Sequence, residues 1–139
     1  MQKKINKDER KKSIKRIEFH LKNFKNYKAA IHNIEKQLKF LSVQHNSNII
    51  QEEKTDYKIQ SLKLLKKELS KNQLIIEAIE VAMSELSEIE QKFIHLRYFN
   101  NWSIEKCAME IGYSDKSLFV KRNNVMDKLL ISLSCIDYI

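Results

Sequence analysis

The sequence predicts an all-α protein, and three observations support that fold class. The 139 residues contain one glycine and no proline, although β-hairpins, tight turns and phosphate-binding loops draw on both. Apolar residues recur at steps of three and four over two long stretches, which is the spacing of amphipathic helices. Serines stand at helix-capping positions between shorter segments in the C-terminal half. Sheet-based nucleotide-binding folds and P-loops are therefore all but excluded.

The first long helix is predicted from residue 12 to about residue 44. Its apolar residues follow a heptad seam that Lys28 and Glu35 interrupt, namely Ile14, Ile17, Leu21, Phe24, Ile31 and Leu38. The polar residues His45 to Asn48 should end this helix, because they favour turns and caps.

A second periodic stretch follows, with Ile59, Leu62, Leu65, Leu69, Ile76, Ile79, Met83 and Leu86 as its apolar stripe. The polar triplet Ser70-Lys71-Asn72 is where we expect a kink or a division. Two such helices with a short polar loop predict a long N-terminal antiparallel hairpin. A dimeric coiled coil of the same seams buries the same residues, and the sequence leaves that alternative open.

Shorter helices are predicted in the C-terminal half. Ser87 and Glu90 have the spacing of a capping box, so a helix should begin there and run to about Phe99, before Asn100 and Asn101. Ser103 is expected to cap a helix over residues 104–111 that stops at Gly112, and Ser114 to cap a final helix over residues 115–131. We therefore divide the chain into a basic hairpin (residues 1–71) and a compact C-terminal domain (residues 72–139).

The segment from Ile104 to about Arg122 has the form of a helix-turn-helix. Ala108 stands where the two helices should cross most closely, and Gly112 falls at the turn position that needs a positive φ. Ile111 and Leu118 supply further inward contacts, and Cys107 on the same face is interpreted as a small hydrophobic residue. These features predict a DNA-binding module.

Residues from about Asn72 to Leu133 also resemble region four of the sigma-70 family, the domain that reads the promoter −35 element. The shared pattern comprises Leu86-Ser87, Leu96-Arg97-Tyr98, Trp102-Ser103, Ala108, Ile111-Gly112, the capping Ser114, Leu118 and Lys128-Leu129. With a hairpin in front of it, the chain looks like the small phage and prophage regulators of the ArpU/RinA type. That resemblance implies a transcriptional regulator acting on late or packaging genes.

The angular position of each residue around the second helix of the motif predicts whether it faces DNA bases or DNA phosphates. The residues that should face base edges in the major groove are Lys116, Ser117, Phe119, Val120 and Asn123. The residues that should contact phosphates are Ser103, Lys106, Lys121, Arg122 and Asn124.

Charge is distributed unevenly along the chain. Residues 1–40 carry 13 Lys and Arg against 4 Asp and Glu, residues 41–84 carry 6 against 6, and residues 85–139 carry 7 against 8. The whole excess of +8 therefore lies in the N-terminal third, which predicts either a polyanion-binding segment or a face kept soluble by lysine. Because the predicted DNA-binding module has almost no net charge, it would need the N-terminal helix or a second subunit to bind DNA tightly.

No catalytic constellation stands out, so we expect no enzymatic activity, no cofactor and no metal site. No apolar run is long enough for a membrane span, and two cysteines do not make a disulfide framework. These patterns favour an intracellular, reduced protein, and the resemblance to phage regulators implies the cytoplasm of a bacterial host cell.

The expected partners are double-stranded DNA, RNA polymerase, and a second copy bound through the N-terminal helices or the C-terminal tail. Two other functions remain open from sequence. One is a small-terminase-like DNA-packaging subunit, and the other is a polymerase-binding adaptor that does not contact DNA.

Overall fold

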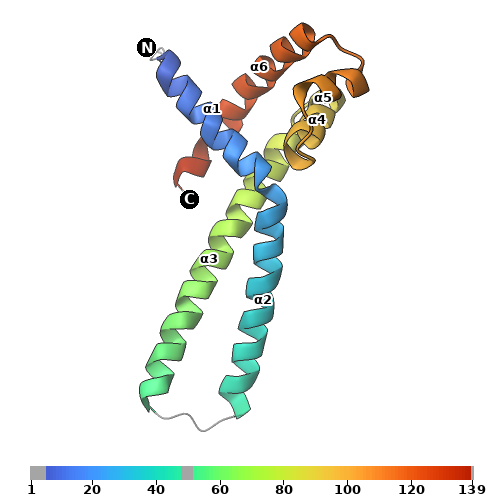
Figure 1. The fold of residues 1–139 in the computed structure, drawn as a ribbon. Helices are drawn as coiled ribbons and strands as arrows, with labels where there is room; N and C mark the ends of the chain where they lie inside the picture. The colour runs from blue at the N-terminus through green and yellow to red at the C-terminus, as the bar shows by residue number, and fades with distance from the viewer. Residues whose placement is uncertain (1–5, 48–51, 139) are drawn as a thin grey trace.

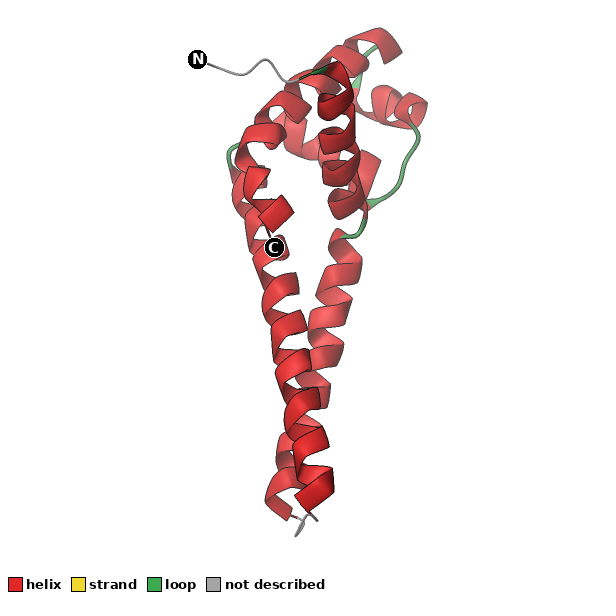
Figure 2. Cartoon of the chain, turned by 90° about the vertical axis from the view of Figure 1, so that its left-hand side faces the viewer, coloured by secondary structure: helices red, strands yellow, loops and turns green. Residues whose placement is uncertain are grey.

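The computed structural model describes residues 6–47 and 52–138, with side chains for residues 6–43 and 56–138. This part of the chain is helical apart from short turns, and it contains no strand, which confirms the all-α prediction (Figures 1 and 2). Its elements are α1 (Lys7–Lys22), α2 (Phe24–Ser47), α3 (Glu52–Ser84), α4 (Glu88–Ile94), the π-helical η1 (His95–Phe99), α5 (Ile104–Ile111), α6 (Asp115–Ser132) and the 3-10 helix η2 (Ser134–Tyr138).

Helices α2 and α3 lie antiparallel, side by side, and extend away from the other helices (Figures 1 and 2). In Figure 1 the two helices separate toward their far ends. Ile34 on α2 and Ile76 on α3 are buried in the half of the hairpin nearest the other helices. The seam residue Lys28 lies 3.9 Å from Glu80 and also stacks on the ring of Phe24, so its charge is accommodated at the edge of the contact.

Two sequence predictions about these helices are wrong. Helix α3 is not divided at the polar triplet but runs from Glu52 to Ser84. Asn72 is buried there while Ser70 and Lys71 are exposed, so the triplet fits the two faces of one helix. Helix α2 also continues through Ser47 instead of ending at His45, and Asn48 lies outside the described residues.

The single helix predicted from residue 12 to residue 44 is also wrong, because the chain breaks at Asn23. The Asn23 backbone has φ −96° and ψ 8°, and its side-chain amide donates to the Phe19 carbonyl at 2.8 Å. Asparagine competes with helical hydrogen bonding in this way, which makes it a natural place to end a helix. Helix α1 therefore leaves the line of α2 and crosses α6 (Figure 1).

This crossing joins the N-terminal helix to the core of the C-terminal half. Ile14, Ile17 and Leu21 of α1 are buried in one continuous cluster with residues of α3, α4, α5 and α6. At the predicted boundary between residues 71 and 72, α3 runs on without interruption. The division into residues 1–71 and 72–139 stays a prediction, and the structure shows that α1 packs across it.

The remaining helix boundaries follow the predicted caps. Ser87 and Glu90 form the reciprocal capping box at the start of α4, and the segment that follows ends before Asn101, which has a φ of +58° that asparagine tolerates. The last turn of α4 continues as the π-helical η1, which buries Tyr98. At the C-terminus Ile136 is buried, and η2 packs against α3 and α6.

Candidate nucleic-acid interface

A tight turn at Gly112 joins α5 to α6. Gly112 has φ +86° and ψ 28°, and its amide and that of Tyr113 both donate to the Ala108 carbonyl at 2.9 Å. This left-handed end satisfies a carbonyl that α5 would otherwise leave unpaired. A Cβ built on Gly112 meets no atom within 4 Å, so the backbone conformation rather than space requires glycine here.

Serine caps begin both helices. The Ser103 hydroxyl accepts from the Lys106 amide at 3.2 Å, and the Ser114 hydroxyl accepts from the Ser117 amide at 3.1 Å. Ser114 also donates to the Ser117 hydroxyl at 2.9 Å, so the side chain of Ser117 is already partly engaged. These caps set where α5 and α6 begin, and with them which residues stand in the first turn of each helix.

The residues predicted to hold the two helices together face inward. Ala108 and Leu118 are buried, and Ile111 is half-buried against the same core. Cys107 is fully buried beside them, and burial raises the pKa of its thiol despite the nearby charges of Arg97 and Lys106. The thiol is therefore protonated at neutral pH and packs as a small apolar group.

The residues predicted to read bases separate into two groups. Lys116, Ser117, Phe119 and Val120 are exposed together on the first two turns of α6, with Phe119 at 56% and Val120 at 54% exposure. Asn123, one turn further on, is half-buried and accepts from Arg122 at 3.4 Å. The exposed part of the predicted reading face is thus its N-terminal end.

The residues predicted to contact phosphates are also divided. Ser103, Lys106 and Asn124 are exposed, and the Lys106 ammonium lies 4.0 Å from the centre of the half-buried Trp102 ring. Lys121 is half-buried, as expected for a long side chain that runs along apolar surface. Arg122 is held within the molecule, because it lies 3.3 Å from Glu18 of α1.

Glu18 connects three elements, and sequence reasoning did not identify it. Its carboxylate accepts from the Tyr98 hydroxyl at 2.7 Å while it pairs with Arg122. Burial and this carboxylate raise the pKa of Tyr98, so the phenol remains a donor over the physiological range. A second pair, Arg10 with Asp127 at 2.6 Å, also ties α1 to α6. Helix α1 therefore covers the C-terminal half of α6 and leaves its N-terminal turns exposed.

A signal for these pairs was present in the charge distribution. Residues 85–139 carry one more acidic than basic residue, beside an N-terminal third with an excess of nine positive charges. The structure pairs Arg10 with Asp127, and Arg16 with Asp137 at 3.1 Å. Part of the N-terminal excess is therefore neutralised inside the molecule.

A further ion pair orients α6 against α4. Lys128 donates to both carboxylate oxygens of Glu90 at 2.8 and 3.0 Å, and Glu90 is only 1% exposed. Burial disfavours the charged form of Glu90, but hydrogen bonds from Lys128 and Ser87 outweigh it and lower the pKa of the carboxyl. The capping box predicted from sequence is thus also the anchor for α6.

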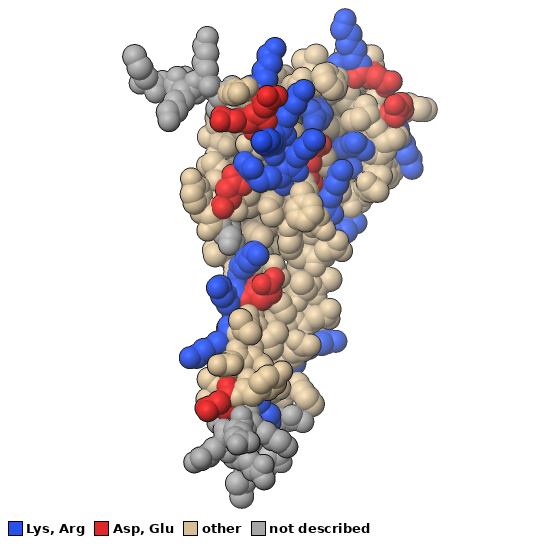
Figure 3. All heavy atoms as spheres, turned by 60° about the vertical axis from the view of Figure 1, so that its left-hand side comes forward, with Lys and Arg blue, Asp and Glu red and all other residues tan. Residues whose placement is uncertain are grey.

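Basic side chains gather on the broad upper part of the molecule (Figure 3). Five lysines of α1, Lys7, Lys11, Lys12, Lys15 and Lys22, are exposed there, and no ion pair within 4 Å involves them among the residues the structure describes. Residues 103–121, by contrast, carry three lysines against three acidic residues. These lysines therefore place exposed positive charge next to a nearly neutral α5–α6 pair.

The described residues contain no group of three or more His, Cys, Asp or Glu side chains arranged to hold a metal ion. None of the helices in residues 6–47 and 52–138 combines the length and the apolar character needed to cross a membrane. Comparisons of the chain with protein-family models, with curated proteins and with solved structures find no match.

Proposed function

We propose that this protein is a sequence-specific, double-stranded-DNA-binding transcriptional regulator that reads the major groove with the N-terminal turns of α6. The observation that carries the proposal is the α5–α6 pair. Two serine-capped helices are joined at a left-handed glycine, and Lys116, Phe119 and Val120 are exposed at the start of the second helix. Helix-turn-helix proteins contact base edges with that end of the recognition helix.

The chemistry of the exposed residues suits base recognition. Lys116 can donate to the O6 and N7 acceptors of guanine, and Phe119 and Val120 offer apolar surface to thymine methyl groups. Asn123, half-buried beside Arg122, is a weaker candidate for base contact than its sequence position indicates.

The five exposed lysines of α1 supply the charge that α5 and α6 lack. Because α1 is fixed to α6 through Glu18–Arg122 and Arg10–Asp127, its lysines have a set position relative to the reading helix. Neutralising phosphates with such lysines raises affinity for every DNA sequence alike. In this proposal α6 provides specificity and α1 provides most of the affinity.

The assignment to phage late-gene regulators rests on the resemblance to the ArpU/RinA type alone, and RNA polymerase is a proposed further partner on the same ground. The test is selection of binding sites from random duplexes, followed by affinity measurement on the selected site. Lys116→Ala should weaken binding to the selected site by about 1–3 kcal/mol and binding to random DNA much less.

Lys66→Ala is the matched control, because Lys66 is equally exposed but lies on α3. Recovery of no preferred sequence, or a Lys116→Ala protein with unchanged preference, would overturn the proposal. If the protein binds RNA polymerase but does not bind DNA, the adaptor function is favoured instead.

A further inference from the structure

The far half of the α2–α3 hairpin, here called the distal hairpin (residues 35–43 and 56–71), has an apolar composition without an apolar core. It holds ten large apolar or aromatic side chains: Leu38, Phe40, Leu41, Val43, Tyr57, Ile59, Leu62, Leu64, Leu65 and Leu69. Not one of the residues described in this segment is fully buried. A two-helix hairpin can bury only the facing sides of its helices, and a third helix is the usual way to cover the rest.

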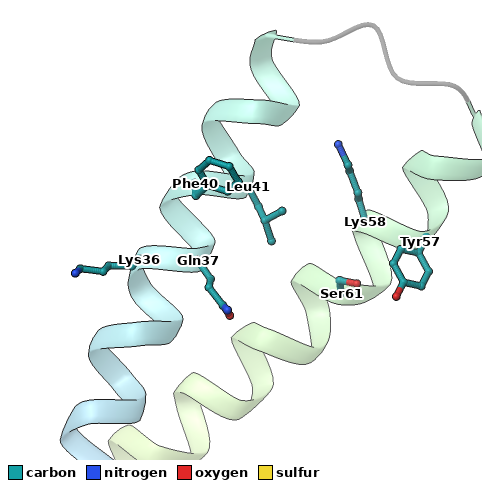
Figure 4. Close-up of a pocket in the computed structure, with 7 residues that line it drawn as sticks. All are labelled: Lys36, Gln37, Phe40, Leu41, Tyr57, Lys58 and Ser61. Atoms are coloured by element: carbon teal, nitrogen blue, oxygen red, sulfur yellow. The ribbon is translucent and has the colours of Figure 1, made fainter.

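An open groove of about 550 Å³ lies on the distal hairpin between the two helices. Figure 4 shows Leu41 and Gln37 from α2 and Lys58 from α3 pointing toward the space between the two helices, whereas Lys36 and Tyr57 extend to its outer sides. Phe40 and Tyr57 border it and are 61% and 74% exposed. Its size falls within the range of roughly 300–1,000 Å³ that ligand-binding sites span, and its lining is largely apolar.

The charge of the side chains around the groove indicates which kind of molecule can bind in it. Lys36 and Lys58 are the charged residues among those that line the groove in the described part of the chain. The distal hairpin as a whole carries seven lysines against three acidic residues, a net charge of +4. A second copy of this face would bring two such charges together, whereas an acidic partner would be attracted.

We propose that the distal hairpin binds an acidic amphipathic helix of another protein, in the groove lined by Phe40, Leu41 and Tyr57 together with Lys36 and Lys58. The apolar side of that helix covers the exposed apolar groups and completes a three-helix arrangement. Its flanking carboxylates pair with the two lysines, in the helix-in-groove mode of recognition. This inference does not depend on DNA binding by α6.

The test uses three labelled peptides of about 18 residues, roughly five helical turns. The first has leucines at helical spacing with glutamates on both flanks, the second has lysines in place of the glutamates, and the third is a scrambled version of the first. We expect the full-length protein to bind the glutamate peptide at least about tenfold more tightly than either control in fluorescence anisotropy.

Two variants locate the binding surface. Phe40→Ser with Tyr57→Ser should weaken binding of the glutamate peptide by about tenfold or more, because both side chains supply apolar contact area. Phe19→Ser with Val81→Ser is the matched control, since both residues are exposed elsewhere, and it should change nothing. Lys36→Glu with Lys58→Glu should reverse the preference toward the lysine peptide.

Three outcomes would overturn the proposal. The first is equal binding, or no binding, of all three peptides by the wild-type protein. The second is a wild-type dimer in sedimentation analysis that becomes a monomer in the Phe40→Ser/Tyr57→Ser variant, which would make a second copy the occupant. The third is competition by duplex DNA. If duplex DNA displaces the peptide from the wild-type protein, and DNA binding is lost in the Lys36→Glu/Lys58→Glu variant but kept in the other variants, the surface is a nucleic-acid site.

Discussion

The two ends of the hairpin are built from similar residues but pack very differently. Near the C-terminal helices, Leu21, Ile79 and Phe93 have no exposed surface, because they belong to one core to which α1, α3 and the C-terminal helices all contribute. In the distal hairpin, residues of the same types, such as Leu65 and Leu69, are only half-buried between two helices. The comparison teaches that an apolar heptad stripe indicates a contact face and not the depth to which that face is buried. The number of surrounding helices sets that depth.

The largest predicted effect tests this difference directly. Leu21→Ala should lower the free energy of unfolding by about 2–5 kcal/mol, because it leaves a cavity in the core that α1 shares with the C-terminal helices. Leu65→Ala in the distal hairpin should cost less than about 1 kcal/mol, since its side chain is already half-exposed. Urea unfolding followed by circular dichroism measures both, and equal losses would contradict the comparison.

The next effect concerns Glu90, which holds both the α4 cap and Lys128. Glu90→Ala should cost about 2 kcal/mol, because it removes the capping box and the charged hydrogen bonds between Glu90 and Lys128. The exposed Glu88→Ala in the same first turn is the control and should cost only a few tenths of a kcal/mol. Similar losses for the two variants would mean that Glu90 does not anchor α6.

Glu90 also predicts a pH dependence. Its pKa in the folded protein lies below the unfolded value, so its stabilising contribution is present at neutral pH. That contribution should begin to fall once the pH drops below the unfolded-state pKa of about 4.3, and it should be lost as the pH falls through the lower folded-state pKa. The melting temperature, measured from pH 6 to pH 3, should therefore fall less steeply in Glu90→Gln than in the wild type. Parallel curves would show that the carboxyl is not stabilised in its charged form.

A smaller effect is expected at Gly112. Gly112→Val should destabilise the C-terminal helices by roughly 1 kcal/mol or somewhat more, because a β-branched residue is forced to positive φ. Gly112→Asn should cost less, since asparagine tolerates that conformation and the site has room for a side chain. Melting temperatures compare the three proteins. If valine and asparagine cost the same, crowding and not backbone conformation would decide the turn.

The smallest effect on stability, and a distinct effect on DNA binding, is expected on α1. Changing Lys11, Lys12 and Lys15 together to Gln should alter stability by less than about 0.5 kcal/mol, because all three are exposed. The slope of log K against log salt should become shallower by up to roughly 0.9 per lost phosphate contact. Arg16 is left unchanged in this variant, because it pairs with Asp137.

The control for α1 neutralises Lys39, Lys63 and Lys66, which removes the same charge from the distal hairpin. Its salt slope should match that of the wild type. Equal changes in both triple variants would mean that DNA responds to overall charge and not to α1.

The sequence by itself determined the elements whose causes are local. Ser87 with Glu90, Ser103 before Ile104, and Ser114 before Asp115 begin helices where predicted, because a side-chain oxygen at an N-cap satisfies amides only two or three residues away. Gly112 ends α5 for an equally local reason, its positive φ. The caps and turn of the proposed DNA-binding motif could therefore be located from residue types and spacing.

Only the tertiary structure decided the course of α1. Its stripe and that of α2 follow one heptad seam, which only Lys28 and Glu35 interrupt, yet Leu21 packs with the C-terminal helices and Ile34 is buried where α2 lies against α3. Periodicity records which residues share a face and contains no information on which distant element covers that face. The pairs Glu18–Arg122 and Arg10–Asp127 join residues more than a hundred positions apart. Helix α1 covers the second half of α6 and leaves its first turns exposed. This arrangement therefore depends on packing between segments far apart in the chain.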